Sequence, residues 1–99
     1  MTGYQRKYLR GLAHGLKPVV QVGHGGVTEP VLGAVETALL DHELIKVRLL
    51  KPENKKALAR ELAQGAGAEL CGLVGHTAIL YKAHPEEPVI VIPEREAAG

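Results

Sequence analysis

A short glycine-rich string, Gly23-His24-Gly25-Gly26, has the residue types in this 99-residue sequence that best suit ligand binding. Glycines let the backbone approach a ligand closely, and a helix that begins after them directs free N–H groups and the positive end of its dipole at a phosphate. The P-loop pattern fails because no lysine follows the glycines, and the dinucleotide pattern fails because Thr28 replaces its third glycine. A G-x-x-G clamp on a nucleic-acid backbone fits Gly23 and Gly26. Taken alone, the string favours a tight structural turn.

Positive charge gathers in the part of the chain that leads into this string. The net charge is only +1, but residues 1–25 contain four basic residues and no acidic one, namely Arg6, Lys7, Arg10 and Lys17. Residues 61–99 contain two basic and six acidic residues. This asymmetry suggests a surface that faces a polyanion, and the alternative is a set of solvated helix faces.

Composition excludes several classes of protein. The chain has no Trp, Phe or Ser and three Tyr residues, so readers that stack bases on a row of aromatics and enzymes with a serine nucleophile are both excluded. A single cysteine, Cys71, cannot form an internal disulfide. With no apolar run of about 18 residues and no basic-then-apolar leader, we expect a cytoplasmic globular domain without a membrane partner.

The titratable residues show no arrangement suited to catalysis or to metal binding. The histidines form no H-x-x-H or H-x-x-x-H pair, and Cys71 has no neighbouring ligand residue in the sequence. Acidic residues are scattered over predicted outer faces instead of paired in an apolar setting. We therefore expect neither an enzyme nor a metal site, and no cofactor or small-molecule substrate.

Hydrophobic periodicity predicts an α/β (α+β) chain with the order α-β-α-β-α-β-β. The predicted helices span 3–14, 28–41 and 52–64, and the predicted strands span 18–22, 44–50, 69–74 and 77–82. Gly15 and Gly65 are the expected helix stops, Thr28 is the expected N-cap, and Gly75-His76 suits a type II′ hairpin turn. A short edge strand at 89–92 is also predicted. Two successive β-α-β steps imply parallel strand pairings with right-handed crossovers, and the final hairpin adds an antiparallel strand. The expected architecture is a small mixed sheet covered by helices on at least one face.

The strand at 44–50 carries two kinds of side chain in strict alternation. Ile45, Val47 and Leu49 share one face, which should meet the helices, while Lys46 and Arg48 share the other. The two basic residues either extend a basic surface or pair with charges on neighbouring strands.

Several motifs at fixed spacing make the sequence resemble the small bacterial CRM-domain proteins of the YhbY family. The resemblance covers about residues 4–82, and the rest, 83–99, forms a C-terminal extension of the same single domain, 1–99. It is carried by Arg6-Lys7, LRGLAHGLKPVVQVG at 9–23, the glycine string with Val27-Thr28-Glu29, HELIKVRL at 42–49, Gly75-His76-Thr77 and Leu80-Tyr81-Lys82. It implies a fold similar to the C-terminal domain of bacterial translation initiation factor three, with an added N-terminal helix. It further implies RNA binding and association with precursors of the large ribosomal subunit during ribosome assembly.

In that family the glycine loop and nearby basic residues contact RNA, which here implies Gly23 to Gly26 and Lys17. Position 24 is often lysine in the family, whereas here it is His24, which offers a hydrogen bond in place of the fixed charge of a lysine. The full predicted set of RNA-binding residues is Arg6, Lys7, Arg10, Lys17, Gly23, His24, Gly25, Gly26, Thr28, Lys46 and Arg48. The expected protein is a monomer that binds ribosomal RNA, and the alternative is a protein-interaction module recruited to ribosomal particles by a protein partner.

Overall fold

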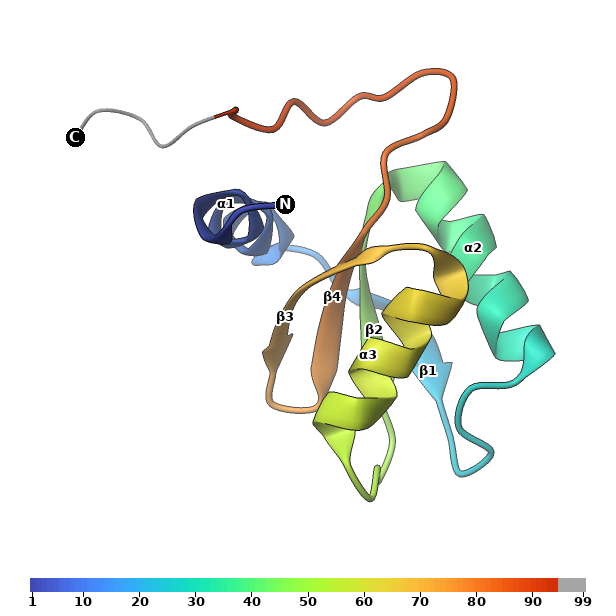
Figure 1. Ribbon diagram of the computed structural model, residues 1–99. Helices are drawn as coiled ribbons and strands as arrows, with labels where there is room; N and C mark the ends of the chain where they lie inside the picture. The colour runs from blue at the N-terminus through green and yellow to red at the C-terminus, as the bar shows by residue number, and fades with distance from the viewer. Residues whose placement is uncertain (95–99) are drawn as a thin grey trace.

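The three predicted helices and four of the five predicted strands form in the predicted order in the computed structural model, which describes residues 1–94 (Figure 1). The part of the predicted C-terminal extension beyond residue 94 lies outside the described residues. The elements are α1 (Gly3–Ala13), β1 (Pro18–Val22), α2 (Glu29–His42), β2 (Leu44–Leu49), α3 (Lys55–Ala66), β3 (Glu69–Val74) and β4 (Thr77–Tyr81).

The four strands form one mixed sheet in the order β1-β2-β4-β3. The first β-α-β step gives the expected parallel pair, β1 with β2, and β3 and β4 form the expected hairpin. The parallel pairing expected from the second step is wrong, because β4 lies between β2 and β3 and pairs with both. β1 runs parallel to β2, while β4 is antiparallel to both β2 and β3. The β3–β4 turn has Val74 opposite Thr77 and a positive φ of 59° at Gly75. Since φ is not positive at His76, the signs agree with the predicted type II′ turn.

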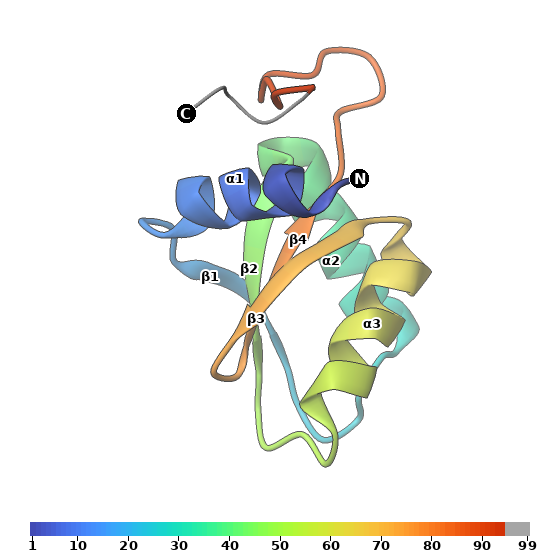
Figure 2. The same ribbon diagram turned by 60° about the vertical axis from the view of Figure 1, so that its left-hand side comes forward.

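Helices cover both faces of the sheet. α2 and α3 lie on one face and α1 crosses the other (Figures 1 and 2). The α2 and α3 side contains the larger core cluster, in which Ile45, Val47 and Leu49 of β2 are buried as predicted. A smaller cluster, under α1, contains Leu9, Ala13, Leu44, Cys71, Ile79 and Tyr81. Among residues 1–94, no helix combines the length and apolar character needed to cross a bilayer.

The prediction that Gly15 ends the first helix in a left-handed conformation is wrong. α1 ends at Ala13, the following His14 keeps a right-handed φ of −53°, and Gly15 does not have a positive φ. The chain leaves the helix through a tighter bond instead, in which the Leu16 N–H donates to the Ala13 carbonyl at 2.9 Å.

Both predicted ends of the third helix also need correction. The helix begins at Lys55 and not at 52, because Asn54 caps it by accepting a 3.1 Å hydrogen bond from the Ala57 N–H. It continues through Gly65, the predicted stop, and ends where Gly67 takes the left-handed conformation at φ 66°. A Cβ at Gly65 would lie 2.9 Å from Leu32 Cδ2, so the glycine lets α3 approach α2 closely.

The predicted edge strand at 89–92 does not form. This segment pairs with no strand, and its amides bind a side chain instead: the N–H groups of Val89 and Ile90 each donate to Glu43 Oε1 at 2.8 Å. Ile90 and Ile92 pack against the smaller cluster, whereas Val91 is 81% exposed. We call residues 83–94 the C-terminal segment.

Glu43 is the one buried charged residue among the described residues, with 4% of its surface exposed. It joins α2 to β2, and its Oε2 accepts a third hydrogen bond, from the His84 N–H at 2.8 Å. Burial acts to raise the pKa of this carboxyl group, but the N–H groups of His84, Ile90 and Val89 outweigh burial and hold the pKa below its usual value of 4.5.

We expect this carboxylate to make the free energy of unfolding depend on pH. Because the folded-state pKa is below the unfolded value, the contribution is complete above about pH 4.5 and is lost as pH falls through the folded pKa. The difference in urea-unfolding free energy between the wild type and Glu43→Gln should therefore shrink from pH 7 to pH 3. An equal difference at both pH values would contradict this assignment.

Candidate nucleic-acid interface

The glycine string forms a tight turn between β1 and α2. The Gly26 N–H donates to the Gly23 carbonyl at 3.1 Å, and Gly26 has a positive φ of 67°. The turn favoured by the bare motif is therefore present. It leaves Gly23, His24 and Gly25 exposed at the end of the sheet, where a ligand can reach them.

Thr28 starts the helix that follows the turn, as predicted. Its hydroxyl oxygen accepts a 3.4 Å hydrogen bond from the Val31 N–H. Glu29 occupies the first helical turn, where its carboxylate complements the helix dipole and opposes the approach of a phosphate. Affinity for an anion at this end of the sheet must therefore come from neighbouring cations.

Those cations line a groove between α1 and the α1-facing side of the sheet. Its largest part is a hollow of about 760 Å³. The residues that line it come from α1, from the chain just after it, and from all four strands: Lys7, Arg10, Gly11, His14, Pro18, Lys46, Arg48, Val74, Thr77 and Ile79.

The groove continues to the glycine loop. A second hollow of about 500 Å³ shares Arg48 and Thr77 with the first and is also lined by Gly23, His24 and Lys51. A third, of about 330 Å³, contains Gly23, His24 and Lys51 again, and Glu53 and Glu61 line its α3 side. This continuity follows from the topology, because parallel β1 and β2 end at the same edge, beside the β3–β4 turn (Figure 1). We call the three hollows together the basic groove.

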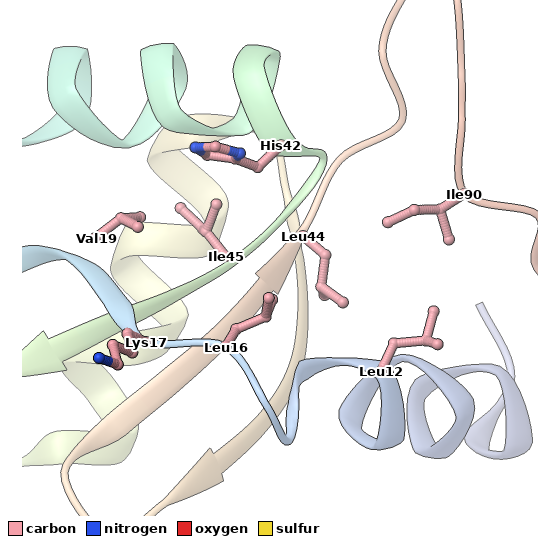
Figure 3. A pocket seen from close by; sticks show the side chains of 8 residues that line it. All are labelled: Leu12, Leu16, Lys17, Val19, His42, Leu44, Ile45 and Ile90. Atoms are coloured by element: carbon pink, nitrogen blue, oxygen red, sulfur yellow. The ribbon is translucent and has the colours of Figure 1, made fainter.

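The structure brings most of the predicted binding residues together. Of the predicted set, Lys7, Arg10, Gly23, His24, Gly26, Lys46 and Arg48 line the basic groove. Within the described chain, Arg6, Lys17, Gly25 and Thr28 are not among its lining residues. Arg6 donates from Nη1 to the Met1 carbonyl at 2.8 Å, and Lys17 lines a separate apolar hollow of about 400 Å³ (Figure 3).

Two groove cations also attach α1 to the sheet. Arg10 donates from Nη1 to the Cys71 carbonyl at 2.7 Å, and a Cβ at Gly72 would collide with the Arg10 side chain. Lys46 donates from Nζ to the His14 carbonyl at 3.3 Å. Each cation makes this bond with part of its donor capacity, since a guanidinium has five N–H donors and an ammonium three.

Of the two alternatives for Lys46 and Arg48, the strand register favours a basic surface over cross-strand charge pairing. Lys46 lies opposite Pro18 on one side and Ile79 on the other, and Arg48 lies opposite Gln21 and Thr77. None of these partners is charged, so direct cross-strand pairing does not neutralise the two cations. Their side chains face the groove.

Lys51 and His76 are among the groove residues that were not predicted. Lys51 follows β2 with a positive φ of 47°, and His76 sits in the β3–β4 turn. The sequence did contain a signal for Lys51: the segments that follow two adjacent parallel strands meet at one edge of the sheet. His76 had no such signal, because the pairing of β4 with β2 had to be known first.

The buried thiol lies beneath α1 and does not reach this surface. Burial raises the pKa of Cys71 to about 11, and Glu69 adds to the shift, so the group is a protonated thiol at neutral pH. Among residues 1–94, no three His, Cys, Asp or Glu side chains gather to hold a metal ion. The groove offers cations, imidazoles and exposed backbone, which together suit a polyanion.

The profile of the CRS1 / YhbY (CRM) domain family matches residues 1–82, which include every element described above. The chain belongs to this family. The resemblance that the sequence motifs carry is thereby confirmed.

Relatives within the CRM family match over nearly the whole chain. The probable RNA-binding protein YqeI of Bacillus subtilis is 39% identical over 95 residues, which cover 94% of this chain and 99% of YqeI. An RNA-binding protein of Haemophilus influenzae is 39% identical over 93 residues, covering 92% and 93% of the two chains. The names of these relatives are those of RNA-binding proteins and not of enzymes.

A solved structure has the same CRM fold. The solution structure of the hypothetical protein SAV1595 from Staphylococcus aureus matches with a TM-score of 0.82 and 36% sequence identity. The match covers 94% of this chain and 99% of that one. The mixed sheet with three helices is therefore shared with an experimentally determined relative.

Proposed function

We propose that this CRM-domain chain binds RNA in the basic groove without catalysing a reaction. The observation that carries the proposal is the continuous path from Lys7 on α1, across Lys46 and Arg48 on β2, to Lys51 and the glycine loop. Cations in such a path attract phosphates, while the exposed loop backbone can lie close to the sugar-phosphate chain. Backbone contacts position a protein without specifying bases, so we expect selection of RNA shape.

We further propose that the RNA is ribosomal and that the protein joins precursors of the large ribosomal subunit during assembly. The support is the family resemblance, to which the groove adds a surface suited to folded RNA. Ultraviolet cross-linking to ribosomal RNA in cells, with the contacted nucleotides mapped, tests this step. Contacts confined to messenger or transfer RNA would contradict it.

Salt dependence gives the first test of the groove. If four to six phosphates are engaged, log K should fall against log salt with a slope of roughly −3 to −5, which weakens binding roughly 8- to 32-fold for each doubling of salt. Fluorescence anisotropy with a structured ribosomal RNA fragment measures the slope. A flat salt dependence would rule out a phosphate-binding groove.

A negative charge beside the glycine loop gives a second test. Gly23→Glu should weaken RNA binding by about tenfold through repulsion of phosphate, while the melting temperature stays unchanged. No atom lies within 4 Å of a Cβ at Gly23, so the fold tolerates the side chain. Gly33→Glu is the matched control, because position 33 has equally open surroundings on α2 and lies outside the groove. Equal losses in both variants would remove the loop from the mechanism.

The apolar hollow favours the alternative of a protein partner. It contains Leu12, Leu16 and Val19, each more than 40% exposed (Figure 3), and it shares no lining residue with the groove. Binding to protein-free ribosomal RNA supports the first proposal. Binding only to assembled particles, lost in Leu16→Asp and retained when the groove cations are removed, supports a protein partner.

A further inference from the structure

The C-terminal segment braces α1. It leaves β4 at the end of the sheet away from the glycine loop and passes over α1 (Figures 1 and 2). Its Ile90 and Ile92 pack against the cluster that holds Leu9 and Ala13 of α1. The Gln5 Nε2 of α1 donates to the Pro93 carbonyl at 3.0 Å.

The brace and the basic groove use opposite faces of α1. Lys7, Arg10, Gly11 and His14 follow the i, i+3, i+4, i+7 spacing of one helical face, and all four line the groove. Gln5 and Leu12 lie on the other face, where Leu12 lies across from Ile90 in Figure 3. α1 is thus held between the C-terminal segment and the groove, and its orientation determines where the groove cations stand.

Glu43 fastens the C-terminal segment to the body of the domain. Its two carboxylate oxygens accept three backbone hydrogen bonds, from His84, Val89 and Ile90, all at 2.8 Å. Hydrogen bonds to an ionised carboxylate are about twice as strong as neutral ones, and burial strengthens them. These bonds join residues 41 to 47 positions apart, so the carboxylate is a long-range tie.

The backbone conformation at Glu43 indicates that the glutamate side chain has a specific role. The residue has φ 63° and ψ −42°, a conformation that side-chain-bearing residues rarely adopt. The backbone alone is held by the bond from the Glu43 N–H to the Leu39 carbonyl and by the bond from the Lys82 N–H to the Glu43 carbonyl, and glycine could make both. A glutamate at this strained position is explained by what its carboxylate binds.

We propose that Glu43 is a positioning residue for the basic groove: by tying down the C-terminal segment, its carboxylate holds α1 in the orientation that forms one wall of the groove. The inference rests on the proposed function for its effect on RNA affinity. Its structural part, the coupling of Glu43 to α1, can be measured without RNA.

Glu43→Gln tests the tie. A glutamine has one acceptor oxygen and an NH₂ group, so it cannot accept from all three backbone donors in the same geometry. Amide hydrogen exchange at Val89, Ile90 and along α1 should become about tenfold faster, while β2 and β4 keep their protection. RNA affinity should fall about five- to tenfold, with a shallower salt slope because fewer phosphates are reached. Loss of folded protein alone would lower the active fraction and leave the slope unchanged.

Two controls separate positioning from general damage. Glu36→Gln removes an exposed carboxylate from the same helix and should change neither exchange nor affinity. Ile90→Ala loosens the same brace from its other end, and Val91→Ala changes an 81% exposed neighbour that should have no effect. Because Glu43 and Ile90 act through one segment, their combined effect on RNA affinity should be smaller than the sum of the single effects.

Each failure points to a different step. Unchanged exchange in α1 of the Glu43→Gln protein overturns the positioning role, whether or not RNA binds. Faster exchange with unchanged RNA affinity overturns the link to the groove, while loss of binding on removal of groove cations leaves the proposed function standing. If Glu43→Gln does not fold, Ile90→Ala decides: lower affinity with intact β2 protection supports the inference, and unchanged affinity overturns it. No binding by the wild-type protein overturns the proposed function itself.

Discussion

Replacing Lys46 and Arg48 together by glutamine is expected to weaken RNA binding about 100-fold. Both side chains lie in the middle of the basic groove, where Arg48 lines two of its three hollows. A charge-assisted contact to phosphate contributes about 1.5 kcal/mol or more, so the loss of two corresponds to about 3 kcal/mol. The salt slope should also fall by about 2, since two fewer phosphates are neutralised. Anisotropy titrations at several salt concentrations measure both quantities.

A matched variant separates the groove from net charge. Lys56→Gln with Arg60→Gln removes the same two charges from exposed positions on α3, on the face of the sheet away from α1 (Figure 1). We expect this protein to bind RNA within about twofold of the wild type, because neither side chain lines any of the three hollows of the groove. Similar losses in both double variants would show that binding follows total charge, and the groove would no longer be the site.

The sequence predicts which face of the sheet a side chain lies on better than it predicts which loops lie close together at the ends of the strands. The alternation of Ile45 and Val47 with Lys46 and Arg48 depends only on the two-residue period of a strand, so it assigns faces without knowledge of the partners. The convergence of Lys51 with the glycine loop depends on which strands are neighbours. The first β-α-β step predicts that β1 and β2 are parallel neighbours, so the sequence contained a signal for Lys51. The approach of His76 depends on the pairing of β2 with β4, which the sequence did not predict.

Glu43 illustrates what sequence patterns could not supply. In the sequence it is an acidic residue at a helix end, next to His42, and nothing nearby suggests burial. Its partners come from residues 84–90, part of which the sequence predicts to be an edge strand. Instead, three backbone N–H groups of the segment donate to the Glu43 carboxylate. A buried charge without hydrogen bonds is costly, and these bonds satisfy it.

The sequence could not show which of two glycines, Gly65 or Gly67, ends α3, because the deciding contact is with another helix. Either Gly65 or Gly67 could have ended the helix by local rules. Gly67 does so because its N–H reaches the carbonyls of both Ala63 and Gln64 in the left-handed conformation. Gly65 remains helical, and the reason for a glycine there lies across the helix interface, at Leu32. Local capping signals contain no information about that contact.

Gly65→Val is therefore expected to destabilise the fold by about 2 kcal/mol, roughly a 30-fold change in the folded-to-unfolded ratio. Valine favours a helix slightly more than glycine does, but its Cβ would lie 2.9 Å from Leu32 Cδ2, and its methyl groups would push α3 away from α2. Gly33→Val is the matched control, since position 33 lies on α2 with nothing within 4 Å of its Cβ, and we expect it to be neutral or slightly stabilising. Urea unfolding of the three proteins measures the difference. If Gly65→Val is as stable as Gly33→Val, the close approach of the two helices does not depend on this glycine.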